Sequence, residues 1–583
     1  MTNPMQFPDG FVFGGATAAY QVEGETRTHG KGKVPWDDFL AAQGRFSPDP
    51  ASDFYNKYPV DIDLCQRFGI NGIRVSIAWS RIFPSGTGEI NPEGVAFYHE
   101  LFATCNKAGV IPYVTLDHFD TPEAFYQNGG EGFLTRTTID AFVEYAKFCF
   151  AEFTEVKHWF TFNEIPATAE GSFIVGNWPH GEKYRLDKAF QLMHNMMVAH
   201  AKAVVAFHEG GFEGEIGIVQ NLEPKYPLDP NSAADCEAAR MADVINNRWV
   251  LDATFRGHYA ADTMEAATKL AHIAGGELDV RDEDIAALTA ALPYNDCLGV
   301  NTYKCQFLRA AEGENDINHN GTGDKGSSRW FLKGVGESCV REGVPTTDWD
   351  WIIYPEGLYD LLLRIKNDYP NYKKIYITEN GMGYKDDFED GFIDDAPRID
   401  YMRQHLAWIL KAIDGGVNVD GLLCVVAAGP VLLDQRLQQA LRPVLHRLRD
   451  PEALSQGERV LVQERRGDRP AHGLIQAAYP LSAACESLHG FACGFFVFGS
   501  TRAGRLSRFV TSSRDFRPQL LQIEMNGGTR FEISRSVIPK LADDLRVFLD
   551  GGAILGGDAR LAHHGVQAVQ AAEGVEVALA DLA

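Results

Sequence analysis

The stretch KHWFTFNE, residues 157–164, decides the fold of this chain. Its middle, Trp-Phe-Thr-Phe, carries no charge, and the run ends abruptly in the polar pair Asn163 and Glu164. Short apolar runs of this kind are typical of strands buried on both faces, as in a parallel sheet. Six similar runs lie along the first 380 residues, at 11–21, 70–79, 109–119, 214–220, 296–303 and 373–380.

Amphipathic helical patterns stand between these runs, for example at 94–109 and 189–211, and the second ends on glycine as helices often do. Seven alternating β/α units predict an α/β fold, a (β/α)8 TIM barrel whose eighth strand and following loop are disrupted. A doubly wound sheet is the alternative, but no glycine-rich phosphate loop follows any of the runs.

The composition excludes several classes of function. The net charge of −25 argues against a nucleic-acid partner or an anionic membrane, because phosphate groups require clustered lysine and arginine. No apolar run approaches the roughly 18 residues of a membrane-spanning helix, and the N-terminus has no signal-peptide pattern. The ten cysteines are scattered without a CxxC pair, so we expect a cytoplasmic protein with no metal and no cofactor.

Polar residues close several of the predicted strands, and chemistry in such barrels collects at these strand ends. A single strand-end glutamate is more often a solvated loop residue or a helix cap. Two of them, each beside an asparagine and joined by His and Gln at other strand ends, instead indicate a glycosidase, which needs two carboxyl groups. The candidates are Gln21, His118, Asn163, Glu164, Asn301, Tyr303 and Glu379.

Longer motifs carry a resemblance to a known family. The segments at 11–24 (FVFGGATAAYQVEG), 73–84 (IRVSIAWSRIFP), 160–165 (FTFNEI) and 375–381 (IYITENG) resemble glycoside hydrolase family 1. The blocks at 51–65, 257–264, 320–328 and 347–381 are similar to the members of that family that cleave 6-phosphorylated β-galactosides. The resemblance runs with few gaps from about residue 7 to residue 421.

The resemblance implies roles for individual residues. It makes Glu164 the acid/base and Glu379 the nucleophile, and it makes Arg74 the cation that keeps the nucleophile ionised. Sugar contacts fall to the other candidates, Gln21, His118, Asn163, Asn301 and Tyr303. A retaining mechanism requires the two carboxyl groups to lie about 5 Å apart. Asp117 departs from the family pattern, which has a second His there, and an ordinary buried side chain is the alternative for His118.

The implied reaction is the hydrolysis of a small phosphorylated disaccharide, lactose 6-phosphate, to galactose 6-phosphate and glucose in lactose catabolism. No nucleic acid or membrane partner is expected. A 6-phospho-β-glucoside and an unphosphorylated β-galactoside or β-glucoside remain alternative substrates. From another class, an inactive sugar-binding protein with a C-terminal interaction domain is also possible, although a binding protein has no need of a nucleophile.

The composition changes abruptly at Gly421. The residues from there to the end hold 18 basic and 17 acidic side chains, a net charge of +1, so the first 420 carry −26. All nine Trp precede Gly421, and 17 of those 18 basic residues are Arg. An inserted domain, a divergent eighth strand and a slip of the reading frame each explain a change of this kind.

The genetic code favours the frame slip. Codons that begin on the second base of each written codon, from Leu422 onward, can encode Tyr-Phe-Val-Trp-Ser-Leu-Gln-Asp-Leu-Phe-Ser-Trp-Thr-Asn-Gly-Tyr-Ser-Lys-Arg-Tyr-Gly. This matches the end of the family's chain and continues to Gln463, across 42 codons. The written residue dictates the first base of every shifted codon, so a chance match of this length is excluded.

We therefore divide the chain into three parts. Residues 1–421 form the glycosidase domain with strands 1–7, 422–463 are a frame-shifted remnant of strand 8 and the phosphate loop, and 464–583 are a read-through tail without an assigned domain. The Ser, Lys and Tyr that bind the phosphate in the family correspond to Leu432, Gln439 and Leu441, and the strand-end Trp corresponds to Val425. No phosphate-binding residue is intact, so we expect impaired hydrolysis and aggregation on expression.

Overall fold

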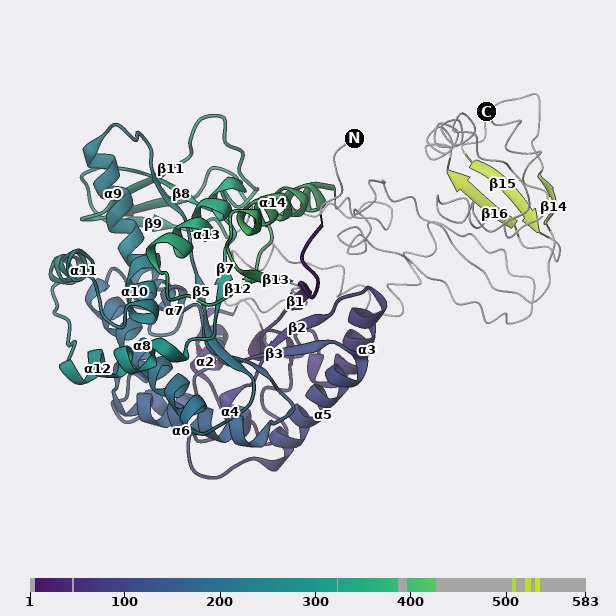
Figure 1. Cartoon of the computed structure of the whole chain (residues 1–583), viewed down its shortest axis with the longest axis horizontal. Helices are drawn as coiled ribbons and strands as arrows, with labels where there is room; N and C mark the ends of the chain where they lie inside the picture. Colours follow the sequence, from purple (N-terminus) through teal and green to yellow (C-terminus); the bar gives the residue numbers. More distant parts are fainter. Residues whose placement is uncertain are drawn as a thin grey trace. The chain divides into compact units, whose positions relative to one another are not determined.

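The computed structural model describes residues 6–44, 47–321, 323–385, 396–425, 506–509, 520–525 and 530–534. Eight parallel strands form a closed barrel in the order β1-β13-β12-β7-β5-β4-β3-β2 (Figure 1). The barrel strands are β1 (Val12–Ala16), β2 (Gly72–Ser76), β3 (Ile111–Asp117), β4 (His158–Asn163), β5 (Glu215–Asn221), β7 (Cys297–Asn301), β12 (Ile375–Glu379) and β13 (Val419–Val425). The seven strands predicted from the sequence are confirmed.

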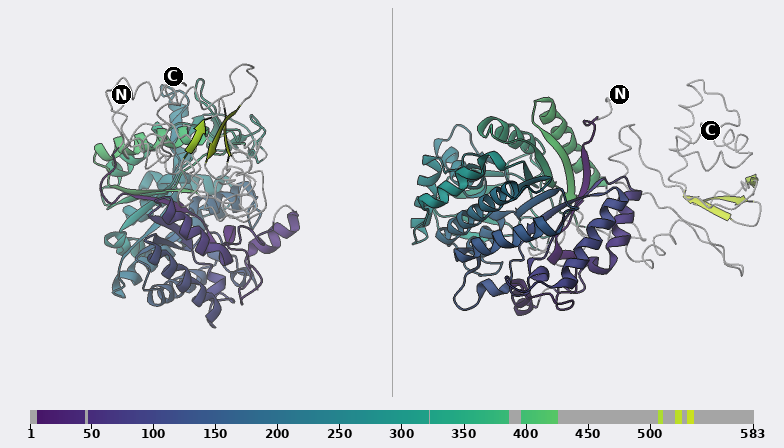
Figure 2. Two further views of the ribbon diagram at one scale, coloured as in Figure 1. Left: turned by 90° about the vertical axis from the view of Figure 1, so that its right-hand side faces the viewer. Right: turned by 60° about the horizontal axis from the view of Figure 1, so that its bottom comes forward.

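The expectation that the eighth strand is disrupted is wrong. β13 pairs in parallel with β1 from Val12–Gly421 to Ala16–Val425, and on its other side with β12 (Figure 2). Leu422 and Leu423 are buried, so the apolar side chains of this segment are sufficient to complete the ring. The predicted domain boundary at 421 therefore falls inside a strand, while the residues after Val425, for which the sequence predicts a disrupted loop, lie outside the described residues.

Helices surround the barrel, and both helical patterns quoted from the sequence are confirmed in α5 and α8. The helices are α1 (Ala19–Val22), α2 (Pro35–Gln43), α3 (Phe54–Arg67), α4 (Trp79–Ile82), α5 (Pro92–Ala108), α6 (Thr137–Glu152), α7 (Ile165–Ala169), α8 (Leu186–Glu209), α9 (Ala233–Asp243), α10 (Trp249–Phe255), α11 (Ala261–Ile273), α12 (Asp282–Ala291), α13 (Glu356–Asp368) and α14 (Ala396–Asp414). Among the described helices, none is both long and apolar enough to cross a membrane.

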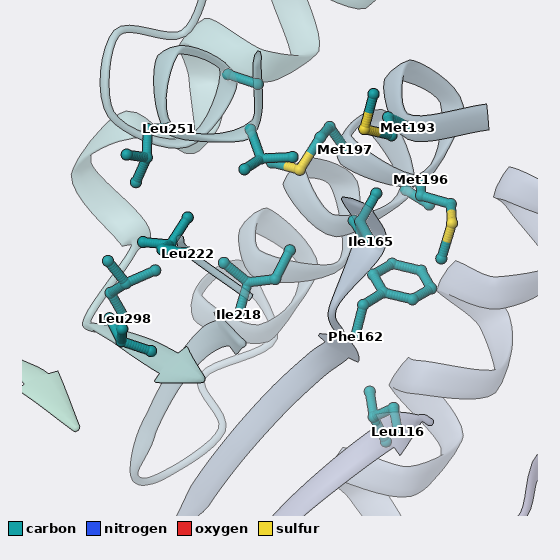
Figure 3. Close-up of a cluster of buried hydrophobic side chains, with 14 of the residues drawn as sticks. Leu116, Phe162, Ile165, Met193, Met196, Met197, Ile218, Leu222, Leu251 and Leu298 are labelled. Atoms are coloured by element: carbon teal, nitrogen blue, oxygen red, sulfur yellow. The ribbon is translucent and has the colours of Figure 1, made fainter. Parts of the chain in front are cut away.

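Two layers of apolar side chains form the core. The barrel interior is filled by Val12, Ala16, Tyr113, Phe160, Val219, Cys297, Tyr376 and Leu423. Outside the strands, the methionines of α8 lie over Phe162 and Ile218 at the strand ends (Figure 3). These unbranched side chains adapt to the uneven surface between helix and sheet.

A second sheet, with order β6-β8-β11-β10-β9, comes from segments that follow β5 and β7. Its strands are β6 (Lys225–Pro227), β8 (Gln306–Arg309), β9 (Asp316–Asn318), β10 (Arg329–Leu332) and β11 (Gly336–Cys339). Three strands near the C-terminus form a separate antiparallel sheet. They are β14 (Leu506–Phe509), β15 (Leu520–Met525) and β16 (Arg530–Ser534).

Candidate functional site

Arg74 joins three strand ends at the centre of the candidate site. The side chain is fully buried on β2 and donates from Nη1 to Oε1 of Glu379 at 2.6 Å. Its Nε donates to Oγ1 of Thr115 on β3 at 3.0 Å, and its Nη2 donates to Oδ1 of Asn163 on β4. A buried guanidinium requires such partners, and here two of them are sequence-predicted site residues.

Glu379 ends β12 and is only 7% exposed. Besides Arg74, it accepts a hydrogen bond on Oε2 from the Tyr303 hydroxyl. Burial raises the pKa of Tyr303 well above its ordinary value, and the charges of Glu379 and Glu164 raise it further. The phenol therefore keeps its proton and acts as a donor. Arg74 and Tyr303 thus each donate to a different oxygen of the Glu379 carboxyl group.

Glu164 follows β4 in a left-handed backbone conformation, with a φ of 49°. Its backbone N–H donates to the Val219 carbonyl at 2.8 Å, which connects this residue to β5. Its Oε1 accepts a hydrogen bond from Nδ2 of Asn301 at 2.6 Å. A non-glycine residue in this conformation is strained, and such strain often occurs at functional sites.

Asn301 connects the two carboxyl groups through a short network. Its Nδ2 lies 3.1 Å from Oδ1 of Asn163, the same oxygen that accepts from Arg74, and its own Oδ1 accepts from Thr378 at 2.6 Å. A chain of contacts thus runs from Glu164 through Asn301, Asn163 and Arg74 to Glu379. The structure brings these residues into a single polar cluster, as the sequence predicted.

His118 lies beside Arg74, with 3.4 Å between its Nδ1 and Nη2 of the arginine. Burial, and secondarily the Arg74 charge, lowers the pKa of His118 well below its usual value, so the imidazole is neutral. Asp117, whose role the sequence left open, accepts from the Phe119 backbone N–H at 3.3 Å and from the Thr121 hydroxyl at 2.7 Å. It therefore holds the loop that carries His118.

Gln21 is the candidate with the weakest connection to the cluster. It lies on α1, directly after β1, and its side chain is half-buried. In the described part of the chain, no hydrogen bond joins it to the other six candidates or to Arg74. Its position at the carboxyl end of the barrel agrees with the prediction, whereas a contact with the cluster does not follow from the structure.

The comparisons with known proteins agree with this geometry. The model of glycosyl hydrolase family 1 matches residues 3–428. The chain belongs to this family. The 6-phospho-beta-galactosidase of Leptotrichia buccalis is 56% identical over 416 residues, which cover 71% of this chain and 89% of the relative. The protein of the same name from Staphylococcus aureus is 55% identical over 416 residues, which cover 71% of this chain and 88% of that relative.

Solved structures of family 1 enzymes share the fold of this family 1 chain. The β-glucosidase from Exiguobacterium antarcticum is 30% identical with a TM-score of 0.67, covering 78% of this chain and 98% of that one. The family 1 β-glucosidase from Thermotoga maritima is 30% identical with a TM-score of 0.63, again covering 78% and 98%. The chain is thus a glycoside hydrolase with an eight-stranded barrel.

A pocket opens beside Glu164 in this family 1 barrel, and the sequence did not predict most of its walls. Two π-helical turns, Glu170–Val175 and Val244–Arg248, contribute to it, and such turns are frequent at functional sites. The polar and aromatic residues missed from the sequence are Glu170, Asn177, Trp178, Asn221, Glu223, Asn246, Thr302, Lys304, Gln306, His319, Trp330 and Trp351. The one available signal was position, since Lys304 directly follows Tyr303 and Glu223 follows β5 closely.

Proposed function

We propose that this chain is built to hydrolyse the β-glycosidic bond of 6-phospho-β-galactosides, such as lactose 6-phosphate, with retention of configuration. The observation that carries the mechanism is the difference between the two glutamates. Glu379 contacts a cation and a phenol donor, whereas Glu164 contacts the neutral amide of Asn301. The substrate class is supported by relatives that are 55–56% identical and carry the name 6-phospho-beta-galactosidase.

In the first step, the Glu379 carboxylate attacks the anomeric carbon while Glu164 gives its proton to the glycosidic oxygen. The bond to the leaving sugar breaks, and a glycosyl ester forms on Glu379. In the second step, Glu164 takes a proton from water, and the water oxygen displaces Glu379 to release galactose 6-phosphate. Arg74 and Tyr303 stabilise the carboxylate that leaves in this step.

The remaining candidates hold the sugar in this proposal. Asn163 and Asn301 lie between the two glutamates and can donate to the hydroxyl beside the anomeric carbon. His118 offers a neutral imidazole, and Gln21 an amide, at neighbouring strand ends. Hydrogen bonds to the hydroxyl next to the reaction centre strengthen in the transition state of glycosidases.

Covalent trapping tests the assignment of the nucleophile. A 2-deoxy-2-fluoro-β-galactoside 6-phosphate with an activated leaving group slows the second step, so the glycosyl ester accumulates. We expect peptide mapping by mass spectrometry to locate the added mass on Glu379, and no added mass in Glu379→Gln. Modification of another carboxylate would contradict the assignment, and inversion of the product's anomeric configuration would contradict retention.

We also propose that the chain after Gly421 is the end of this enzyme translated in a shifted reading frame. The support is the hidden match from Leu422 to Gln463 and the composition change at Gly421. The family match stops at residue 428, and about a tenth of each relative's length stays unmatched. Leu432, Gln439 and Leu441, the positions of the lost phosphate ligands, lie outside the described residues.

Reading the gene across codons 421–422 tests the frame shift. An inserted base, or two lost bases, relative to a gene that encodes the hidden ending is the expected result. Detection of natural tail peptides from 464–583, together with full activity on lactose 6-phosphate, would contradict it. Because a neutral Gln and two Leu cannot replace charged phosphate ligands, we expect the chain as written to hydrolyse that substrate weakly.

The alternative substrates are 6-phospho-β-glucosides and unphosphorylated β-glycosides, and the similarity to β-glucosidase structures favours the latter. Nitrophenyl glycosides of the four types, assayed with a frame-restored chain in which the hidden ending follows Gly421, separate these possibilities. We place the reaction in the cytoplasm. The eight described cysteines form no disulfide, which fits a reducing compartment.

A further inference from the structure

We propose that Asp350 is a positioning residue for the nucleophile. By binding the turn between β9 and β10, it holds the next residue, Trp351, against Tyr303, whose phenol donates to Glu379. The inference rests on the proposed function, because it takes Glu379 as the nucleophile. It gives a role to a side chain that the two-step mechanism does not use.

The Asp350 carboxylate accepts three hydrogen bonds from the β9–β10 turn. Its Oδ1 accepts from the Gly326 backbone N–H at 2.6 Å, and its Oδ2 accepts from the Ser328 N–H at 3.0 Å and from Nδ2 of Asn320 at 3.1 Å. Burial raises the pKa of Asp350, but these hydrogen bonds prevail and lower it. The carboxyl group is therefore ionised, and hydrogen bonds to an ionised acceptor are strong. We call Asp350 and its three partners the Asp350 clamp.

The turn that the clamp binds is itself ordered around Asn320, which is only 3% exposed. The Oδ1 of Asn320 accepts from the backbone N–H groups of Gly323 at 2.9 Å and Asp324 at 3.1 Å. Its Nδ2 also lies 2.9 Å from the Asp348 carbonyl oxygen, so the turn contacts the loop before Trp351 at a second point. The clamp therefore joins two segments that each have a defined conformation.

The backbone at Asp350 is left-handed, with a φ of 63°. A non-glycine residue in this conformation costs of order 1–3 kcal/mol and persists only where its surroundings enforce it. Here the surroundings are the clamp and Thr347, whose N–H donates to the Trp351 carbonyl at 2.9 Å and whose Oγ1 accepts from the Trp351 N–H at 3.1 Å. The strained residue thus fixes the direction in which the chain enters Trp351.

Trp351 transmits this order to the nucleophile through one aromatic contact. Its side chain is buried, and its ring centroid lies 5.5 Å from that of Tyr303, with the two planes inclined by 58°. Tilted pairs at this separation are favourable. Tyr303 lies two residues beyond the end of β7, so its ring depends on such neighbours for its orientation. A donor held in place stabilises charge on the nucleophile without reorganising during the reaction.

Hydrogen exchange on the full-length chain tests the clamp without any substrate. Asp350→Asn keeps the size of the side chain and tolerates the left-handed backbone, but it has one acceptor oxygen where the clamp uses two. We expect amide exchange in 323–332 and 347–352 to become about tenfold faster, because hydrogen bonds to a charged group are lost. Exchange in β4 should stay unchanged. Unaltered exchange at Gly326 and Ser328 would overturn the clamp.

Kinetics of the frame-restored chain test the connection to the nucleophile. With nitrophenyl β-galactoside 6-phosphate, we expect Asp350→Asn to lower kcat about tenfold and Tyr303→Phe, which removes the donor, to lower it about 100-fold. If Asp350 acts through Tyr303, adding Asp350→Asn to Tyr303→Phe should lower kcat by less than about twofold further. A merely structural role would give the same tenfold loss in both backgrounds, and that result would overturn the proposal.

Asp316→Asn is the matched control, because it makes the same chemical change in an exposed pair with Arg329 on the same hairpin. It should change neither kcat nor exchange in 347–352. An unchanged kcat in Asp350→Asn, with near-UV circular dichroism showing a folded chain, would also overturn the positioning role. Absence of hydrolysis by the unmodified frame-restored chain would instead contradict the proposed function, and exchange would still decide whether the clamp exists.

Discussion

Arg74 shows how much of this site depends on a single side chain. The guanidinium is fully buried and contacts Glu379, Thr115 and Asn163, which come from three different strands. Removing one member of a buried ion pair leaves the other charge without compensation, which costs more than the pair contributes. The residue thus supports both the proposed chemistry and the barrel itself.

Arg74→Met is expected to lower kcat of the frame-restored chain by at least about 100-fold, since the proposed nucleophile loses its cation. It should also lower the free energy of unfolding by about 3–5 kcal/mol. Steady-state kinetics and urea denaturation measure the two effects. Arg403→Met, which removes an exposed pair with Asp400 on α14, is the control and should change neither by much. Comparable kinetics in both variants would contradict the role of Arg74.

Asp117 makes stability depend on pH. Burial raises its pKa from 3.8 to about 6, although hydrogen bonds from Thr121 and Phe119 oppose the shift. Above pH 6 the folded chain must ionise a buried carboxyl group, whereas the unfolded chain ionises it freely above pH 4. The folded chain therefore loses stability as pH rises from about 4 to 6, and the loss persists at higher pH.

At pH 8, Asp117→Asn is expected to raise the free energy of unfolding, measured by urea denaturation, by about 2–3 kcal/mol. The reason is that the amide is never ionised. At pH 5, where much of the native Asp117 is already protonated, the gain should fall to roughly half. Tryptophan fluorescence monitors unfolding of the barrel, because all nine Trp precede Gly421. The same gain at both pH values would show that the carboxyl group does not titrate in this range.

At the scale of elements, β13 forms although the proposed frame shift lies at its middle. Leu and Val codons carry T as the middle base, and a frame that starts on that T encodes residues such as Tyr, Phe and Trp. Both frames therefore supply apolar side chains to the strand, which a barrel interior requires. The ion pair of Lys374 with Asp420, at 3.3 Å, adds a contact at the start of the strand.

Leu423→Ala is expected to destabilise the barrel by about 2–5 kcal/mol, because Leu423 is fully buried in the barrel interior. Cys424→Ala, at a half-buried position of the same strand, should cost about 1 kcal/mol or less. Urea denaturation followed by tryptophan fluorescence measures both. Equal small effects would indicate that β13 does not contribute to the folded barrel.

Gly14→Ala is predicted to destabilise the closed barrel more strongly than Leu423→Ala does. A Cβ at Gly14 would lie 2.6 Å from the Gly72 carbonyl oxygen and 2.6 Å from Cδ2 of Leu423. The backbone carbonyl cannot move without breaking the pairing of β1 with β2, so the strands must separate. We expect a loss of the cooperative unfolding transition at 37 °C. Gly44→Ala, where a Cβ meets nothing within 4 Å, tests the added methyl group alone, although its φ of 63° adds a small strain.

At the scale of the whole molecule, the chain contains two compact units, one of them holding the barrel and the other all of the residues from Asp450 to Ala583. The first 420 residues carry a net charge of −26, whereas the residues from Gly421 on have a balance of +1. Under the proposed frame shift, the chain keeps the two glutamates proposed for catalysis but loses the residues that would bind the phosphate. The two functions can therefore be measured separately.

Restoring the frame after Gly421 is expected to raise kcat/KM for nitrophenyl β-galactoside 6-phosphate by at least about 100-fold, since three charge-compatible ligands each contribute roughly 1–3 kcal/mol. The unphosphorylated galactoside should gain far less. The measured quantity is the ratio of kcat/KM for the two substrates, before and after restoration. An unchanged ratio would contradict a phosphate site in the hidden ending.

Local sequence patterns were sufficient for seven strands and for the polar residues at their ends, because buried parallel strands are apolar runs whose carboxyl ends all lie at one rim of the barrel. The contact of Arg74 with Glu379 spans 305 positions, and no local pattern contains it. The walls formed by Glu223, Lys304 and Trp330 come from separate segments that meet only in the folded chain. The eighth strand, too, was decided by tertiary structure. The segment Val419–Val425 is ambiguous by itself, and it becomes a strand because β1 and β12 each present an unpaired edge that only ring closure can satisfy.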